Sequence, residues 1–145
     1  MEGTVVSINI SSKKGIAKTP VKYITLIKDF GLKDDAHGGN HHRQVSLLGK
    51  ESIDMMKKQG YDICCGGFGE NITTEGITLY ELPLTTILCI RDVVLEVTQI
   101  GKTCHRPCAI FYEIGSCIMP KQGIFAKVLK GGEIKVGDKI EVTIK

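Results

Sequence analysis

Short runs of alternating or β-branched apolar residues recur along the whole chain, and glycine-rich turns separate many of them. This two-residue periodicity is typical of strands that bury one face. The expected strands are residues 3–10, 21–28, 44–48, 85–90, 93–100, 124–129 and 139–144. Only Arg91 and Asp92 separate the fourth strand from the fifth, which predicts a hairpin. Short strands in this number, with few helices, predict a mostly-β barrel or sandwich.

One stretch has helical rather than strand periodicity. Residues 50–59 place their apolar side chains toward one face, and Gly60 follows at the position that favours a helix C-cap. Pro107 suits the first position of another short helix. We therefore expect one or two short helices beside the strands.

The length and composition restrict the class of protein. A chain of 145 residues with 42% hydrophobic residues fits one globular domain spanning residues 1–145. The net charge is only +3, the lysines are dispersed and tryptophan is absent, so we expect no nucleic-acid partner. The sequence begins without a signal-peptide pattern, and no apolar run approaches the roughly 20 residues that span a bilayer. We expect a cytoplasmic protein with no membrane partner.

Cysteine is the main source of candidate chemistry. The six cysteines are at positions 64, 65, 89, 104, 108 and 117. They are too few for a disulfide scaffold, and the cytoplasm keeps thiols reduced. At least one of them is then a candidate nucleophile, metal ligand or sulfur carrier. Cys89 lies in an apolar strand and is expected in the core, whereas Cys64, Cys65 and Cys117 are expected to be structural.

The segment 102–108 places two thiols among cationic side chains. These cations are Lys102, His105 and Arg106. Pro107 disfavours helical geometry in the residue before it, so we expect Cys104 in a loop and Cys108 in the first turn of the following helix. Unpaired amide groups in that turn and the nearby cations favour the thiolate of Cys108, with Cys104 as a resolving or auxiliary thiol. The alternative is that Cys108 is a small buried hydrophobic residue.

Two glycine-rich loops add candidate anion contacts. The first, residues 31–43, contains His37 beside two glycines and Arg43, whose forked guanidinium suits phosphate or carboxylate. Its histidines match no standard zinc spacing, which argues against a structural zinc site. The second loop, residues 66–71, has the alternative role of making tight turns. In a barrel, both loops and the thiol segment could converge at one mouth.

Several motifs in one order resemble the MOSC domain, the module found at the C-terminus of molybdenum cofactor sulfurases. The matching stretches are GLKDDAHGG (31–39), RQVSLL (43–48), GFGENI (67–72), TQIGKTCHRPC (98–108), GIF (123–125) and IKVGD (134–138). The resemblance implies a mostly-β, barrel-like fold and a cysteine that carries sulfur or contacts molybdenum, which by position is Cys108. The residues expected to bind the cofactor are His37, Arg43, Gln44, Asn71, Lys102 and His105.

The resemblance implies a protein that binds molybdopterin or the molybdenum cofactor and carries or transfers sulfur through Cys108, in the manner of a sulfurtransferase. The expected partners are a cysteine desulfurase or other sulfur donor, and molybdoenzymes or cofactor-biosynthesis proteins. Sulfurases extract sulfur with a separate pyridoxal phosphate domain, so no pyridoxal phosphate is expected in this chain. Two alternatives stay open: a reductase of N-hydroxylated substrates with molybdenum bound at Cys108, and a non-enzymatic module that binds or stores the cofactor.

Overall fold

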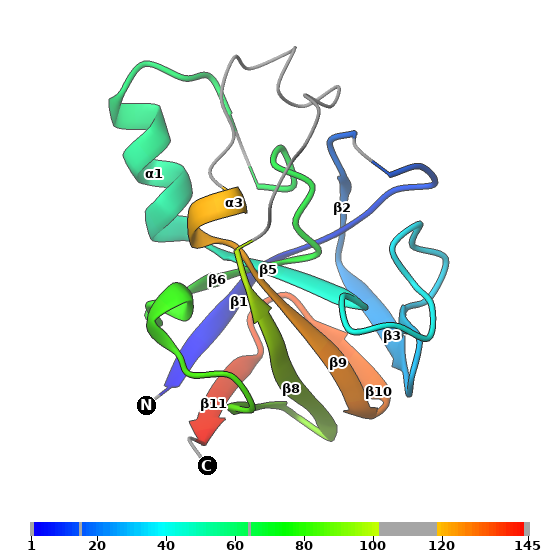
Figure 1. The fold of residues 1–145 in the computed structure, drawn as a ribbon. Coiled ribbons are helices and arrows are strands. Elements are labelled where there is room, and N and C mark those ends of the chain that lie inside the picture. Colours follow the sequence, from blue (N-terminus) through cyan, green and yellow to red (C-terminus); the bar gives the residue numbers. More distant parts are fainter. Residues whose placement is uncertain (1, 15, 64, 102–118, 144–145) are drawn as a thin grey trace.

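The computed structural model describes residues 2–14, 16–63, 65–101 and 119–143, and within them seven strands close into a barrel (Figure 1). Around the barrel, the strands are β1 (Glu2–Ile10), β11 (Lys139–Thr143), β7 (Ile87–Ile90), β8 (Val93–Ile100), β9 (Ile124–Lys130), β5 (Val45–Gly49) and β6 (Ile72–Glu75). Neighbouring strands are antiparallel except β5 and β6, which run parallel. Since β1 pairs with both β6 and β11, the sheet closes. The predicted barrel-like fold is confirmed.

Shorter elements surround the barrel. Strand β2 (Thr19–Val21) pairs with the end of β1, and a separate sheet has the order β10 (Gly132–Lys135), β3 (Tyr23–Ile27), β4 (Gly31–Leu32). The helical elements are α1 (Lys50–Lys58), the 3-10 helix η1 (Leu79–Glu81) and α3 (Met119–Gln122). In the described part of the chain, none of the helices has the length and apolar character needed to cross a membrane.

Most expected elements form at their predicted positions. The hairpin between β7 and β8 is present, and Arg91 takes a left-handed φ of 53° in its tight turn. Helix α1 ends at Lys58, and Gly60 follows with a φ of 98°, the conformation that terminates many helices. Residues 21–28, expected as one strand, instead divide at Lys22 between β2 and β3.

The apolar pattern does not predict β6 or β10. The sequence of β6 is ITTE, and that of β10 is GEIK. Each has a single apolar residue, Ile72 in β6 and Ile134 in β10, so neither has the alternation by which a strand is recognised. Their neighbours hold them in place, because β6 pairs with both β1 and β5, and β10 pairs with β3.

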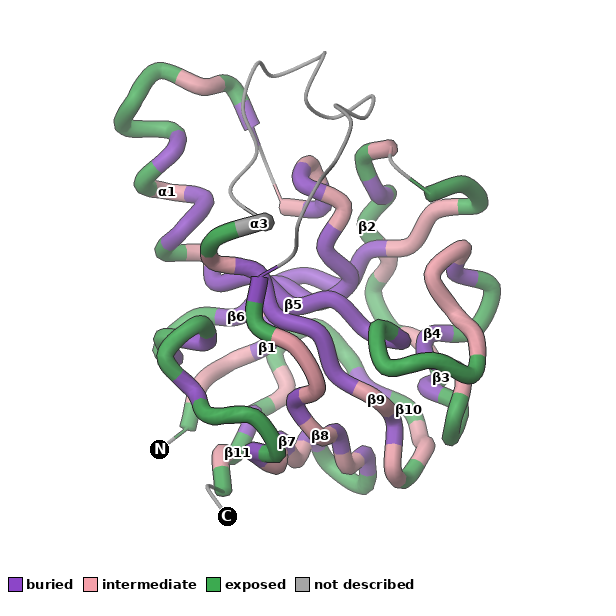
Figure 2. The backbone as a smooth tube through the Cα atoms, viewed as in Figure 1, coloured by how far each residue is buried: buried purple, intermediate pink, exposed green. Residues whose placement is uncertain are grey.

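Apolar packing occurs on both faces of part of the barrel wall, and β5 there is buried along its whole length (Figure 2). In β8, Val93, Leu95 and Val97 are buried in the interior and alternate with half-buried residues. All five residues of β5 are buried, because a second apolar cluster covers the outer face of this strand. The cluster packs α1 and the loop after it against the barrel, and consists of Leu48, Ile53, Met56, Ile63, Phe68 and Phe125.

Beside this apolar cluster, the outer face of β1, β6 and β5 is polar but still buried. Asn9, Thr73 and Ser46 each adjoin a residue of the interior core in their strands, so their side chains point outward. The loop of residues 66–71 covers them. The Asn9 amide donates to Thr73 Oγ1 at 3.4 Å, and Ser46 Oγ donates to the carbonyl of Gly69 at 3.3 Å.

The carboxylate of Glu70 attaches this loop to the barrel. It accepts hydrogen bonds from the backbone N–H of Gly66 at 2.9 Å, from that of Phe68 at 3.2 Å and from Thr73 Oγ1 at 2.9 Å. Burial raises the pKa of Glu70, while these hydrogen bonds to the charged form oppose the rise. The Glu70 carboxylate therefore holds the loop against the barrel.

A buried ion pair joins three further segments of chain. Lys18 Nζ lies 2.7 Å from Asp35 Oδ1, and both side chains are fully buried. Asp35 also accepts from the backbone N–H groups of Ser11 and His37, both at 3.1 Å. The backbone N–H of Lys18 donates to the carbonyl of Gly66 at 2.8 Å. The pair therefore connects the segment after β1, the loop after β4 and the loop before β6.

Burial and pairing act in opposite directions on both charged groups. Burial lowers the pKa of Lys18, and the hydrogen bond to Asp35 offsets only part of this effect. Burial alone would raise the pKa of Asp35, but hydrogen bonds from Lys18, Asn71 and Ser11 hold it below its usual range. Asp35 is therefore a carboxylate at neutral pH.

Replacing Asp35 by asparagine is expected to lower the free energy of unfolding at neutral pH by about 3–5 kcal/mol, because the Lys18 ammonium then stays buried without its counter-ion. The pKa of Asp35 is lower in the folded state than in the unfolded state. Its stabilising contribution is therefore present above the unfolded-state pKa and is lost as the pH falls through the folded-state pKa. Urea denaturation over a series of pH values should show the difference between the two proteins shrinking in acid.

Asp54→Asn is the matched control for this change, because Asp54 pairs with Lys50 in an exposed position, with side chains 44% and 40% exposed. It should change the free energy of unfolding far less than Asp35→Asn does, because water screens an exposed ion pair. A loss in Asp35→Asn that is the same at every pH would contradict the proposed ionic origin.

Gly66→Ala is expected to destabilise the protein more than Gly60→Ala. Both glycines have left-handed φ angles, 85° and 98°, where alanine costs about 1–2 kcal/mol. An added Cβ at Gly66 would lie 2.6 Å from the carbonyl oxygen of Lys18, whereas at Gly60 it would meet nothing within 4 Å. Urea denaturation measures the free energy of unfolding of both variants. Equal decreases in this free energy would show that the loop is not held closely against Lys18.

Candidate functional site

The two described site loops, residues 31–43 and 66–71, lead into β5 and β6 at one end of the barrel (Figure 1). Strand β1 finishes at this end, and β5 and β6 begin there. Strand β9 runs antiparallel to β5, and Ile124, where β9 begins, lies opposite both Leu47 in the middle of β5 and Ile100, where β8 finishes. The backbone N–H of Gly101, which follows β8, donates to the carbonyl of Gly123 before β9 at 2.7 Å. The chain therefore leaves β8 and returns to β9 at adjacent points.

Four predicted site residues lie outside the described residues. These are Lys102, Cys104, His105 and Cys108. They belong to residues 102–118, which join Gly101 to α3, and the short helix expected at Pro107 lies there too. Their roles as thiols and cofactor contacts stay predictions. The other four, His37, Arg43, Gln44 and Asn71, are described.

His37 stands beside the buried ion pair. Its Nδ1 lies 2.8 Å from Lys18 Nζ, and its backbone N–H donates to Asp35 Oδ2 at 3.1 Å. The side chain is 27% exposed, unlike the fully buried side chains of Lys18 and Asp35. The pair thus holds a partly exposed imidazole ring in a defined position.

Gln44 and Asn71 make their described contacts inside the fold. The Gln44 side-chain oxygen accepts from the backbone N–H of Val128 at 2.9 Å, beside β9. Asn71 Oδ1 accepts from Ser46 N at 3.0 Å, and Asn71 Nδ2 donates to the carbonyl of Asn9 at 3.2 Å. Both residues are buried. They hold strands and loops in register, and their predicted contact with a cofactor stays a prediction.

Arg43 and His42 lie near the end of β8, on an exposed part of the barrel surface that is called the rim below. Arg43 is exposed, and its guanidinium carbon lies 5.9 Å from the centre of the Phe125 ring, a cation–π contact that orients the side chain. His42 Nε2 lies 2.7 Å from Gln99 Oε1, and Gln99 Nε2 donates to the carbonyl of Gly101 at 2.7 Å. Thr98 Oγ1 also donates to the carbonyl of His42. The rim is therefore tied to the point where residues 102–118 begin.

The two glycine-rich loops come together as expected. Lys18 joins them, because its backbone N–H donates to the carbonyl of Gly66 in the second loop and its ammonium pairs with Asp35 in the first. The described thiols, Cys65 and Cys89, are half-buried. Within the described ranges, histidine, cysteine and carboxylate side chains form no cluster of three that could hold a metal ion.

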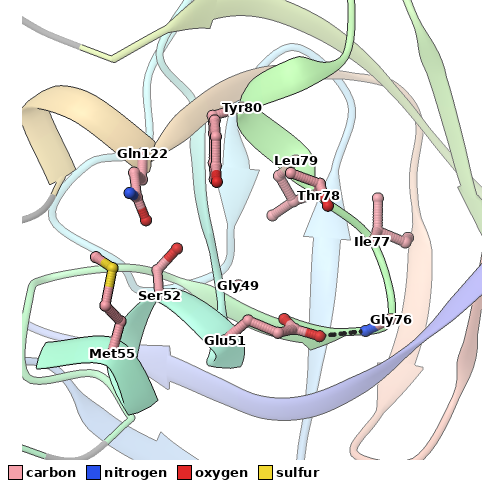
Figure 3. A pocket seen from close by; sticks show the side chains of 10 residues that line it. All are labelled: Gly49, Glu51, Ser52, Met55, Gly76, Ile77, Thr78, Leu79, Tyr80 and Gln122. Carbon is pink, nitrogen blue, oxygen red and sulfur yellow. Dashed lines mark hydrogen bonds between the residues drawn. The ribbon is translucent and has the colours of Figure 1, made fainter. Parts of the chain in front are cut away.

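A separate pocket of about 300 Å³ lies between α1 and η1 (Figure 3). Ser52 of α1, Tyr80 of η1 and Gln122 of α3 line it, and Glu51 closes one side by accepting from the backbone N–H of Gly76 at 2.7 Å. The described lining contains no lysine, arginine, histidine or cysteine. Its chemistry does not suit an anionic ligand, so the barrel end is the better candidate site.

Sequence reasoning did not identify Lys18 and Asp35 as site residues. Lysine and aspartate are mostly exposed in proteins, so neither suggests burial. The two residues are 17 positions apart, so no local spacing marks the pair. The one available signal is that Asp35 lies within GLKDDAHGG, a stretch that carries the family resemblance, whereas Lys18 lies in none of those stretches.

Comparison with known proteins agrees with the fold. The structure is similar to that of the YuaD protein from Bacillus subtilis, with 18% identity, a TM-score of 0.81, and coverage of 98% of this chain and 96% of that one. YiiM from Escherichia coli gives 17% identity, a TM-score of 0.74, and coverage of 100% and 71%. YiiM from Geobacillus stearothermophilus gives 23% identity, a TM-score of 0.73, and coverage of 97% of this chain and 75% of that one. No curated protein matches the sequence significantly.

The family assignment comes from the sequence itself. The MOSC domain family matches residues 33–141, which include the His37 loop, the loop held by Glu70 and the strands from β5 to β10. The resemblance inferred from the separate motifs is thereby confirmed. This chain belongs to the MOSC domain family, which is associated with the molybdenum cofactor.

Proposed function

We propose that this protein binds molybdopterin or the molybdenum cofactor at the barrel end that carries His37, and that it carries or transfers sulfur through Cys108. The family association supports the first part. The main structural support is the partly exposed His37 ring, which a fully buried ion pair holds beside the loops of the matching motifs. A ring fixed in this way is suited to recognising a ligand, because its position is set before the ligand arrives.

The described side chains fit the anionic end of molybdopterin, which carries a phosphate. Arg43 offers a forked cationic donor at the rim, and His37 offers an imidazole. The carboxylates of Asp35 and Glu70 are buried and hydrogen-bonded within the fold, so they are shielded from an anion at the surface. His37 and Arg43 would hold the phosphate. When bound, the cofactor supplies the metal and the dithiolene sulfurs.

The proposed sulfur transfer needs no external oxidant or reductant. The thiolate of Cys108 attacks the outer sulfur of a persulfide on a donor protein. A sulfur–sulfur bond forms at Cys108 while the bond within the donor persulfide breaks, and the donor leaves as a thiolate. Cys108 then carries one additional sulfur atom as a persulfide. The cations expected near Cys108 would favour both the attacking thiolate and the resulting anion.

Incubation with a cysteine desulfurase and L-cysteine should add one sulfur atom to the protein. Intact-mass spectrometry detects the gain, and peptide mapping should assign it to Cys108. Cys108→Ala should abolish the gain, whereas Cys89→Ala should retain it, since Cys89 lies half-buried in β7. Absence of the added sulfur in the wild-type protein, or its retention in Cys108→Ala, would contradict sulfur transfer through Cys108.

Arg43→Ala should weaken molybdopterin binding roughly 10- to 100-fold, the equivalent of losing a charge-assisted hydrogen bond. The affinity of Arg43→Lys should lie between those of the wild type and Arg43→Ala, because lysine keeps the positive charge but lacks the forked donors of the guanidinium. Pterin fluorescence of the bound cofactor measures the loss. Arg91→Ala, at the exposed turn between β7 and β8, is the control and should bind normally.

Two outcomes of these experiments would instead favour the alternatives. Binding of the cofactor without persulfide on Cys108 would favour a storage or binding module. Reduction of N-hydroxylated substrates by the cofactor-loaded protein with an electron donor would favour the reductase.

A further inference from the structure

The Lys18 ammonium lies between two groups that could otherwise interact with each other. Its three hydrogens match three described acceptors: Asp35 Oδ1 at 2.7 Å, His37 Nδ1 at 2.8 Å and Ser11 Oγ at 3.2 Å. His37 Nδ1 lies 3.9 Å from Asp35 Oδ2, which is too far for a hydrogen bond. Lys18 therefore takes the place of a direct hydrogen bond between the His37 ring and the Asp35 carboxylate.

This arrangement sets the tautomer of His37. An ammonium group can only donate hydrogen bonds, so Nδ1 of His37 must accept and cannot carry a proton. The ring is then neutral, with its hydrogen on Nε2. An imidazolium would also carry a hydrogen on Nδ1, and this N–H would face the N–H groups of the Lys18 ammonium, so that two donors would meet.

We propose that Lys18 and Asp35 are positioning residues that hold His37 as the Nε2–H tautomer, so that His37 recognises a ligand as a hydrogen-bond donor. This inference rests on the proposed function for its ligand, a phosphate or a similar oxyanion. The same contact occupies Nδ1, so His37 does not bind a metal ion through that nitrogen. The site therefore selects acceptor groups over metal ions at this position.

The burial of the ion pair makes this control independent of the solvent. Both charged side chains are fully buried, while the ring that they orient is 27% exposed. A lysine at the surface would exchange its partners with water, whereas Lys18 has its three acceptors around it. Backbone donors from Ser11 and His37 also fix the Asp35 carboxylate.

Nitrogen-15 NMR of the ligand-free protein tests the tautomer. In a long-range proton–nitrogen correlation at neutral pH, with His37 assigned by its disappearance in His37→Gln, Nε2 should be protonated and Nδ1 unprotonated. In Lys18→Met, Nδ1 loses this donor while the Asp35 carboxylate stays 3.9 Å away, so the Nδ1–H form should become populated. Lys14→Met, at an exposed lysine of the same segment, should leave the wild-type pattern.

A protonated Nδ1 in the wild-type protein would overturn the proposal even if Lys18→Met fails to fold. An unchanged tautomer in a folded Lys18→Met would also overturn it, because Lys18 would then not be the residue that sets it.

Two substitutions at position 37 test the donor role with molybdopterin as the probe. Glutamine places an N–H group near the position of Nε2, whereas asparagine reaches only the position of Nδ1. His37→Gln should therefore bind the cofactor more tightly than His37→Asn, and equal affinities would contradict a donor role. If the wild-type protein binds no cofactor, the proposed function fails, while the NMR result still decides the role of Lys18.

Discussion

The buried ion pair between Lys18 and Asp35 is the interaction on which the geometry of the barrel end depends. It joins the segment that follows β1 to the loop that follows β4, and the backbone N–H of Lys18 adds the loop that precedes β6 through its hydrogen bond to Gly66. Buried pairs add little net stability, because the loss of hydration offsets the attraction between the charges. What this pair contributes is a unique arrangement, since both charges are satisfied only when the segment after β1 and the loop after β4 are in place.

Two different kinds of packing cover the barrel wall, and they have different consequences. Beneath α1, apolar side chains fill space and tolerate changes of shape. Beneath residues 66–71, each polar group has a directed partner, as in the three hydrogen bonds to Glu70. Directed contacts of this kind fix positions more closely than apolar packing does. The polar part of the outer layer adjoins His37, where the proposed ligand site requires a fixed position.

The strands that could be predicted are those whose burial alternates along the sequence, such as β8. Strand β6 could not, because two threonines face different surroundings and only Ile72 is apolar. In the site, His37 and Arg43 stand out because their residue types suit anions, but Gln44 makes its contact with a backbone group 84 positions away. The role of Lys18 could not be predicted for the same reason. Its burial depends on partners that only the folded chain brings close.

The closure of the barrel has a consequence for how the chain is made. Strand β1 pairs with β11, so that Glu2 lies opposite Glu141 and Thr4 opposite Lys139. These partners come from the two extremes of the described chain, which also lie close together in space (Figure 1). The seam cannot form on the ribosome until β11 has emerged, so β1 keeps one edge unpaired until every other strand of the barrel has been made. Folding of the barrel is therefore completed late, with the long loop closure that slows β-rich domains.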